Sequence, residues 1–108
     1  MPRVLLVGGR ALLAMAPAIA DAGFEVAYEQ TVTEAIDRLQ TYAADVAVLP
    51  TADAMPEFVV ALRRLAPRCR VLAVQAADAE QVALPDGTVA LPADPDEFVA
   101  ALWRATPP

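Results

Sequence analysis

The side chains of this chain that could do chemistry are carboxylates, arginines, threonines, tyrosines and a single cysteine, Cys69. The sequence contains no lysine, histidine, serine or asparagine. These absences exclude Ser-His-Asp and Cys-His nucleophiles, Schiff-base lysines, the lysine of phosphate-binding loops and histidine metal sites. One cysteine cannot form an internal disulfide, and no histidine could activate it as a nucleophile. We therefore expect no catalytic activity and no bound cofactor.

Carboxylates near the C-terminus have a spacing that could serve acid–base chemistry. Asp94 together with Asp96 or Glu97 could form the acid and base of a small enzyme. The same residues also match the start of a helix, with an N-cap at Asp94, a proline at the first helical position and a capping-box glutamate. The helix start accounts for all three acids without catalysis, and we favour it.

Two adjacent glycines, Gly8 and Gly9, follow an apolar run and precede a helical segment. A turn of this kind can hold a phosphate group at a helix N-terminus. The dinucleotide-binding pattern needs Gly-x-Gly-x-x-Gly, and only its first glycine is matched here. Glu29 could serve as the ribose-binding acid, although an isolated glutamate at a strand end is more often solvated. A nucleotide- or small-ligand-binding α/β domain is therefore the alternative function.

The net charge of the chain is −6, which disfavours nucleic acid as a partner because phosphates require a basic surface. No apolar stretch approaches the roughly 20 residues that span a bilayer, and the N-terminus lacks the pattern of a signal peptide. We therefore expect a cytoplasmic protein that does not bind membranes. Four arginines do cluster in the sequence, namely Arg63, Arg64, Arg68 and Arg70.

Apolar runs alternate with segments of helical composition along the whole chain. Short runs that are continuously apolar, or that alternate between apolar and polar residues, predict β-strands. Strands that alternate with helices pair in parallel through right-handed crossovers, which gives a doubly wound α/β domain. The predicted strands are Val4–Val7, Phe24–Tyr28, Val46–Leu49, Arg70–Val74 and Thr88–Leu91.

The first predicted helix spans residues 11–22 and ends before Gly23, which is typical of a helix C-terminus. Pro17 lies inside this segment, so the helix either starts late, with Pro17 in its first turn, or kinks there. Thr33 is expected to cap the second helix. The apolar residues of that helix at helical spacing are Ala35, Ile36, Leu39 and Ala43.

A third helix is predicted over Met55–Leu65 and the last one from Pro95 onward. Between them, residues 78–84 have room for only a shortened or irregular fourth helix. The length of the chain, 108 residues, suits a single domain. We expect this domain to occupy residues 1–105, with 106–108 as a tail or the start of a linker.

Two stretches of the chain, residues 91–98 and 44–50, resemble segments of response-regulator receiver domains. Leu91-Pro92 stands where receivers have Lys-Pro, ahead of a similar acidic cap and last helix. Ala44-Asp45 followed by Val46–Pro50 resembles the third strand, which carries the phosphoacceptor. The resemblance covers essentially the whole chain and implies a five-stranded flavodoxin-like sheet with strand order 2-1-3-4-5.

The same resemblance implies functional positions at the carboxyl ends of the strands. Receivers have two Mg²⁺-binding acids after the first strand, a phosphoacceptor Asp after the third, a Thr or Ser after the fourth and a Lys after the fifth. None of these residue types stands at the corresponding position, and Asp53, three residues past the acceptor position, is interpreted as a loop or capping residue. The positions correspond here to Gly8, Gly9, Pro50, Gln75 and Leu91.

A receiver of this kind, without a phosphoacceptor or metal ligands, resembles the pseudo-receivers, which usually act through protein–protein contacts. On the last helix, Val99 and Trp103 lie off the predicted core stripe of Phe98, Ala101, Leu102 and Ala105. Trp103 either packs against Val82 or Leu84, which we favour, or joins Val99 in a homo- or heteromeric contact. A protein partner or self-association is therefore expected.

Overall fold

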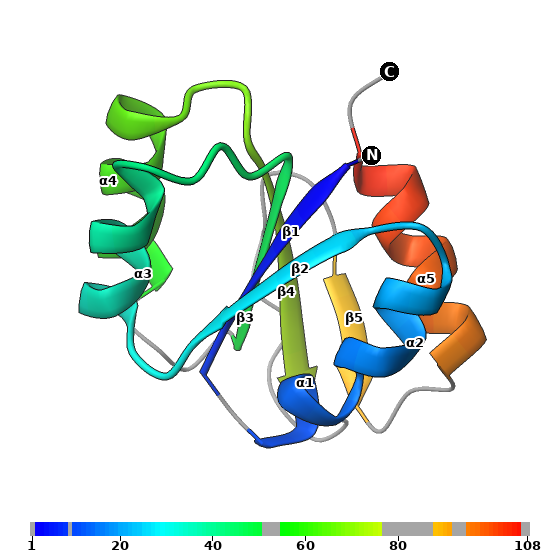
Figure 1. The fold of residues 1–108 in the computed structure, drawn as a ribbon. Helices are drawn as coiled ribbons and strands as arrows, with labels where there is room; N and C mark the ends of the chain where they lie inside the picture. Colours follow the sequence, from blue (N-terminus) through cyan, green and yellow to red (C-terminus); the bar gives the residue numbers. More distant parts are fainter. Residues whose placement is uncertain (1, 9, 51–54, 77–87, 92–94, 107–108) are drawn as a thin grey trace.

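The computed structural model describes residues 2–8, 10–50, 55–76, 88–91 and 95–106. Within these residues all strand pairs are parallel and form one sheet in the order β2-β1-β3-β4-β5, which is the order that the sequence predicts (Figure 1). The predicted irregular fourth helix, residues 78–84, lies outside the described residues. The strands are β1 Arg3–Val7, β2 Glu25–Glu29, β3 Val46–Pro50, β4 Arg70–Ala76 and β5 Thr88–Leu91.

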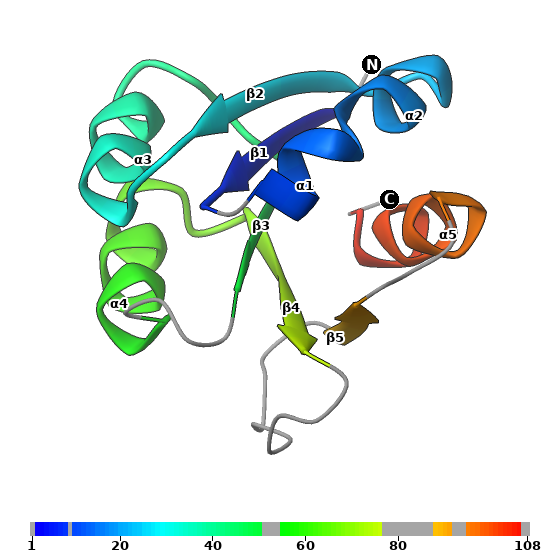
Figure 2. The ribbon, with the colours of Figure 1, turned by 90° about the horizontal axis from the view of Figure 1, so that it is seen from below.

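Helices cover both faces of the sheet, as Figures 1 and 2 show from two directions. Helices α3 and α4 pack together on one face, and α1, α2 and α5 lie on the other. The bounds of α4 and the start of α5 agree with the sequence prediction. The helices are α1 Arg10–Ala14, α2 Ala16–Asp21, α3 Val32–Leu39, α4 Met55–Leu65 and α5 Pro95–Ala105.

The core consists of two apolar clusters, one on each face of the sheet, because successive side chains of a strand point to opposite faces. Along β1, Val4 and Leu6 belong to the cluster beneath α2 and α5, whereas Leu5 and Val7 belong to the cluster beneath α3 and α4. Strand β3 is divided in the same way. Each cluster has one buried phenylalanine from a helix, Phe98 on the first face and Phe58 on the second.

The first helical segment is broken in two rather than continuous. Helix α1 ends at Ala14, and Met15 separates it from α2, in which Pro17 occupies the first turn. The prediction of a late start at Pro17 is therefore correct for α2, although a separate helix precedes it. Proline is tolerated in a first turn because the N–H groups there have no partner within the helix.

The predicted cap of the second helix is wrong by two residues. Thr31, not Thr33, is the N-cap of α3: its backbone is extended, and its Oγ1 accepts a hydrogen bond from the backbone N–H of Glu34 at 3.1 Å. The Thr31 hydroxyl also donates to Oε1 of Glu34. A cap reaches the backbone three residues ahead, so the spacing to Glu34 selects Thr31. Helix α3 ends at Leu39, and Ala43 lies beyond it, exposed.

Helix α2 ends in a Schellman motif, in which a residue of left-handed conformation stops the helix. Gly23 has φ of 102°, and its N–H donates to the carbonyl of Ala20. The N–H of Phe24 donates to the carbonyl of Ile19. This geometry turns the chain into β2, which begins at Glu25, one residue later than predicted, and leaves Phe24 buried in the core.

Replacing Gly23 tests how much this motif contributes to the free energy of unfolding. A Cβ added at Gly23 would meet no atom within 4 Å, so the cost of Gly23→Ala comes from the positive φ alone. We expect Gly23→Ala to lower the free energy of unfolding by about 1 kcal/mol, measured by urea denaturation. Gly23→Asn should cost less, because asparagine tolerates the left-handed region better than alanine. Equal stability of wild type and Gly23→Ala would contradict this account.

Candidate functional site at the carboxyl edge of the sheet

The sheet brings the predicted receiver positions to one edge, with the exception of Gly9, which lies outside the described residues. Gly8 directly follows β1, and Pro50 ends β3. Leu6 pairs with Val48, and Gly8 and Pro50 each lie two residues beyond this pair. Pro50 in turn pairs with Val74, the residue before Gln75.

Strand β5 completes this edge. Leu91, the last residue of β5, pairs with Ala76, the residue after Gln75. The carboxyl ends of the central strands β1, β3 and β4 and of β5 are therefore adjacent, as the parallel topology requires. In open α/β sheets this edge is where ligands usually bind.

Gly8 has a backbone conformation that other residues rarely adopt. Its φ is 84°, it is buried, and its N–H donates to the carbonyl oxygen of Glu29 at 2.9 Å. The left-handed region is disfavoured for any residue with a Cβ. Gly8, which the sequence comparison with receivers predicts to replace the first metal-binding acid, thus has the local geometry of a glycine turn, and its N–H already has a partner.

The chemistry available at this edge is limited by residue type. Glycine, proline and leucine offer no side-chain oxygen or nitrogen, and the amide of Gln75 carries no charge. No group of three or more His, Cys, Asp or Glu side chains that could hold a metal ion occurs among the described residues. A Mg²⁺ ion prefers at least one or two carboxylates, which Gly8, Pro50, Gln75 and Leu91 do not supply.

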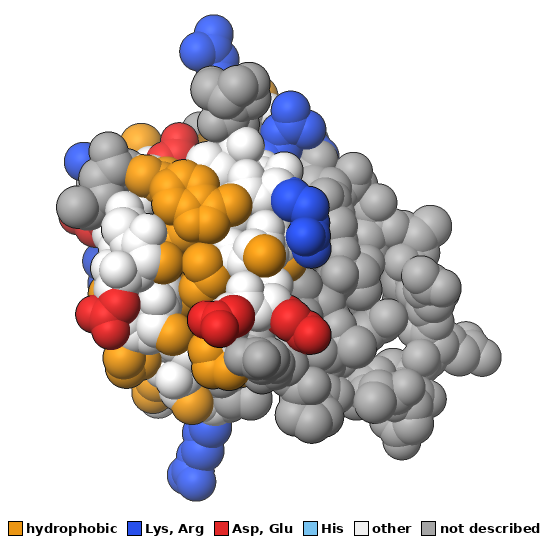
Figure 3. All heavy atoms as spheres, turned by 90° about the vertical axis from the view of Figure 1, so that its right-hand side faces the viewer, with side chains coloured by type: hydrophobic (Ala, Val, Ile, Leu, Met, Phe, Trp, Pro, Cys, Tyr) orange, Lys and Arg blue, Asp and Glu red, His pale blue; other side chains and the backbone are white. Residues whose placement is uncertain are grey.

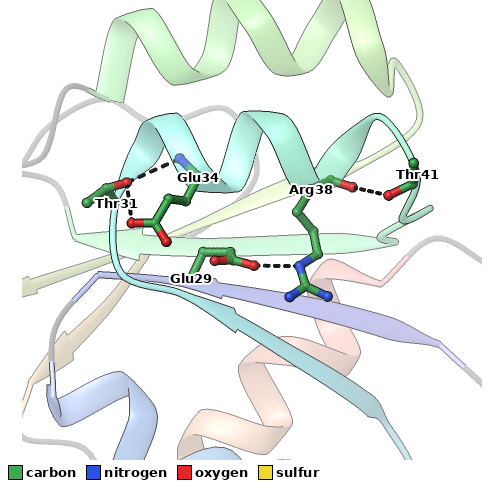
Figure 4. A network of polar contacts seen from close by, with 5 residues as sticks. All are labelled: Glu29, Thr31, Glu34, Arg38 and Thr41. Carbon is green, nitrogen blue, oxygen red and sulfur yellow. Dashed lines mark hydrogen bonds and ion pairs between the residues drawn. The ribbon is translucent and has the colours of Figure 1, made fainter.

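A carboxylate at the end of the neighbouring strand β2 is engaged in an ion pair. Oε1 of Glu29 lies 2.6 Å from Nε of Arg38 on α3, and the Glu29 side chain is only 15% exposed. Figure 4 shows the two side chains pointing toward each other, next to the Thr31–Glu34 cap. The expectation that Glu29 is a solvated glutamate is therefore wrong. Its charge is directed to Arg38 rather than to a ligand.

These contacts weaken the dinucleotide-binding alternative. A phosphate-binding turn needs free N–H groups at the start of a helix, but the Gly8 N–H is bonded to the chain itself. Helix α1, which follows, has only five residues and so only a small dipole. The candidate ribose-binding acid, Glu29, is paired with Arg38.

A groove of about 510 Å³ lies at the opposite, amino end of β3 and β4. It is formed by the loop between α3 and β3 and the loop between α4 and β4. Cys69, which lines it, is buried in the core as expected for a structural thiol. The groove is therefore separate from the edge that carries the receiver positions.

Tyr42 lines this groove and is held by polar contacts. Its hydroxyl donates to the carbonyl of Glu25 at 3.4 Å, and the guanidinium of Arg3 lies 5.7 Å from the centre of its ring. Arg3 also pairs with the Glu25 carboxylate, and its backbone N–H donates to the Asp45 carboxylate. Burial raises the pKa of the Tyr42 phenol above 10.0, and the negative charge of Glu25 raises it further.

On the other side of the molecule, Trp103 of α5 packs on Phe24, the residue that follows the Schellman motif. The ring centroids are 4.4 Å apart and the ring planes are tilted by 43°. Trp103 remains 47% exposed, whereas Val99, one turn earlier, is half-buried against the core. The space-filling view shows that apolar side chains gather on this face, with acidic groups on its lower side (Figure 3).

The contact of Trp103 with Phe24 was missed by sequence reasoning. The predicted partners, Val82 and Leu84, lie outside the described residues, so that prediction stays open. Nothing local links Trp103 to Phe24, because the two residues are distant in sequence and meet only when α5 packs beside α2. The buried stripe of α5 is as predicted and consists of Phe98, Ala101, Leu102 and Ala105.

Comparisons with known proteins agree on the fold. No protein-family model matches the sequence, and no curated protein matches it. Among solved structures, the chemotaxis response regulator CheY4 of Vibrio cholerae superposes with a TM-score of 0.82 at 22% identity, covering 97% of this chain and 98% of that one. A response regulator from Thermotoga maritima gives 0.82 at 17% identity, covering 97% of each chain. The chain has the receiver-domain fold.

A third solved structure also has this fold. A response regulator from Burkholderia pseudomallei, described with a phosphorylated aspartic acid, a calcium ion and citrate, matches with a TM-score of 0.77 at 17% identity. The match covers 94% of this chain and 66% of that one.

Within the described part of this chain, no helix is long and apolar enough to cross a membrane.

The raised pKa of Tyr42 predicts a pH dependence of stability. The folded state holds the phenolic proton more tightly than the unfolded chain, so the associated stability is complete below pH 10.0 and is lost as the pH rises through the higher folded-state pKa. We expect the free energy of unfolding to fall between pH 9 and pH 11 more steeply in wild type than in Tyr42→Phe. Urea denaturation at both pH values measures this, and identical slopes would refute it.

Removing the indole tests the packing of α5 on Phe24. Trp103→Ala should lower the free energy of unfolding by about 1–2 kcal/mol, because it removes an aromatic pair and uncovers a buried ring. Trp103→Phe keeps a ring over Phe24 and should recover about half of that loss or more. The measurement is urea denaturation followed by circular dichroism. A Trp103→Ala protein as stable as wild type would show that the contact contributes nothing to folding.

Proposed function

We propose that this chain is a receiver-like signalling module that acts through protein–protein contacts and does not accept a phosphoryl group. The single observation that carries the proposal is the set of residues at the carboxyl edge of the sheet. The receiver fold brings Gly8, Pro50, Gln75 and Leu91 to that edge, where receivers place acids, an acceptor, a hydroxyl and a lysine.

The physical argument concerns charge. Transfer of a phosphoryl group to a carboxylate depends on positioning the donor and on neutralising its negative charge with Mg²⁺ and a cation. Pro50 provides no nucleophile, and Leu91 provides no cation. Gly8 provides no metal ligand, and its φ of 84° is a conformation that residues with a Cβ adopt only at a cost in free energy. The proposed module therefore lacks catalytic activity of its own.

A protein partner is favoured over a small ligand. The Gly8 N–H donates to the carbonyl of Glu29, and the Glu29 carboxylate is paired with Arg38, so the two described residues of the nucleotide-binding alternative are engaged within the chain. By contrast, α5 exposes a large aromatic side chain, Trp103. Exposed tryptophans at protein surfaces are enriched among residues that dominate binding energy. Val99 and Trp103 therefore belong to the proposed contact surface.

Incubation with acetyl phosphate and Mg²⁺ tests this function. We expect no stable, stoichiometric phosphorylation of the wild-type chain by intact-mass spectrometry, and no change in Trp103 fluorescence on addition of Mg²⁺ alone. A receiver that retains the acids, the acceptor aspartate and the lysine is the positive control. Stoichiometric labelling of the wild-type chain would overturn the proposal, and loss of that label in Asp53→Asn would identify a displaced acceptor.

A second variant separates the missing acceptor from the missing charges. Pro50→Asp restores a carboxylate at the end of β3 but leaves Gly8 and Leu91 without metal ligand or cation. We expect Pro50→Asp to remain unlabelled under the same conditions, because an acceptor alone does not neutralise the donor's charge. Labelling of Pro50→Asp would show that the electrostatic part of the argument is wrong.

A further inference from the structure

Four of the eight basic residues of this chain lie close together in sequence, at the end of α4 and in the loop that leads to β4. Residues 58–77 contain these four arginines and no aspartate or glutamate, although the whole chain has a net charge of −6. All four arginines are exposed. The approach to β4 is therefore a basic region on an otherwise acidic protein. The four residues are Arg63, Arg64, Arg68 and Arg70.

The dipole of α4 accounts for only part of this basic region. Arg63 and Arg64 lie in the last turn of the helix, where cations are stabilised by the carbonyl groups at its end. Arg68 lies in the loop beyond the helix, and the dipole effect falls off within the last turn. The two ion pairs found among the described residues involve other arginines, and neither Arg64 nor Arg68 joins one. The charges of these two side chains can therefore meet an anionic group from outside the chain.

Arg68 also lines the groove of about 510 Å³ at the amino end of β3 and β4. The floor of this groove belongs to the core, since Leu39, Ala44 and Cys69 are each at most 7% exposed. Another lining residue, Leu65, is 42% exposed. Grooves of this volume hold small ligands or a few side chains of a partner. The site combines an apolar floor with a charged rim, which is the usual composition of a protein interface.

The two loops that form the groove are tied to the sheet and to each other. The Asp45 N–H donates to the carbonyl of Arg3, and the Arg70 N–H donates to the carbonyl of Asp45 at 2.9 Å. The Tyr42 N–H donates to the carbonyl of Arg38, also at 2.9 Å. Figure 1 shows both loops on the side of the molecule where β3 and β4 begin. A groove whose backbone is already fixed loses little entropy when a ligand binds.

One carboxylate in the groove opposes an anionic ligand. Asp45 is the only acidic side chain among the described residues that line it, and it is half-buried. Its Oδ2 accepts a hydrogen bond from the backbone N–H of Arg3 at 2.8 Å, which engages part of its charge within the chain. Removing the charge of Asp45 should therefore strengthen the binding of an anion and weaken the binding of a cation.

We propose that this groove binds an extended acidic segment of a partner protein, with an apolar side chain on the floor and carboxylates at Arg64 and Arg68. Arginine is suited to this role because its guanidinium forms two parallel hydrogen bonds with one carboxylate. A nucleic acid is disfavoured by the net charge of −6 and has no use for an apolar floor. The inference goes beyond the proposed function, because it depends neither on the missing phosphoacceptor nor on the α5 face.

Titration with labelled peptides tests the proposal. The probe is a fluorescein-labelled peptide of about six residues in which leucine and glutamate alternate, about 20 Å long when extended. Its matched controls replace glutamate by glutamine or by lysine. By fluorescence anisotropy, the acidic peptide should bind about tenfold or more tightly than the glutamine peptide, because charge complementarity favours it. Raising the salt concentration from roughly 50 to 300 mM should weaken this binding severalfold, since exposed charges are screened.

Substitutions assign the binding to the groove. Arg68→Glu should raise the dissociation constant about tenfold or more, because attraction becomes repulsion. Arg68→Lys keeps the charge without the paired hydrogen bonds and should raise it about threefold. Asp45→Asn should lower it about threefold, because asparagine removes the like charge and keeps an oxygen for the Arg3 N–H. Arg104→Glu makes the same charge change in the last turn of α5, on the other face of the sheet, and should leave the constant unchanged.

Nuclear magnetic resonance locates the peptide on the protein. In isotope-labelled protein, the acidic peptide should shift the backbone amide signals of residues 40–45 and 66–70 and leave those of α5 in place. Circular dichroism melts of each variant report whether it remains folded. A short DNA duplex and vesicles containing phosphatidylglycerol are titrated in parallel, because their phosphates are also anionic.

Each outcome supports or overturns the proposal. Absence of acidic-peptide binding up to roughly 1 mM overturns it. Binding that is indifferent to Arg68→Glu, or that shifts only the signals of α5, overturns this choice of surface. Tighter binding of DNA or of vesicles than of peptide, lost in Arg68→Glu, overturns the acidic segment as the occupant. All of these results are independent of phosphodonors, so a failure here leaves the proposed function intact, and labelling by acetyl phosphate would reject that function alone.

Discussion

β1 and β3 bury every side chain of their apolar runs, and helices must therefore cover both faces of the sheet. Val4 and Leu6 pack in the cluster covered by α1, α2 and α5, and Leu5 and Val7 pack in the cluster covered by α3 and α4. Parallel pairing follows, because each crossover carries one covering helix. The carboxyl ends of the strands then share one edge, whatever residues stand there. The fold is thus a product of core burial, and the residue types at this edge do not determine it.

The carboxyl edge of the sheet and the exposed face of α5 differ in character. At the carboxyl edge, the Gly8 N–H donates a hydrogen bond to the Glu29 carbonyl, so this backbone group has its partner within the chain. On the α5 face, in contrast, Trp103 leaves half of a large apolar ring in contact with solvent. The exposed part of this ring, beyond its contact with Phe24, is apolar surface available to a partner.

Sequence reasoning performed well where a pattern ends on a strong local signal. Helix α4 and strand β5 have the predicted bounds, and prolines lie close to both. It failed where two equivalent residues compete: Thr31 and Thr33 are both possible caps, and only the spacing to Glu34 decides between them.

The contacts between side chains described above could not be predicted from the sequence, for a different reason. Glu29 with Arg38, and Phe24 with Trp103, are brought together by the packing of whole elements, and no local spacing encodes them. The positions at the edge were predictable, because parallel topology alone aligns the strand ends. What those positions do in the cell is a matter of chemistry at the edge, which topology does not specify.

The left-handed turn at Gly8 also affects how such a chain can evolve. An aspartate introduced there by one mutation would carry the strain of its backbone at once, while the benefit of a metal site would arrive only with further changes at Pro50 and Leu91. Under the proposed function, a phosphorylation site would therefore need several substitutions, because none of them alone supplies the acceptor, the metal ligand and the cation together.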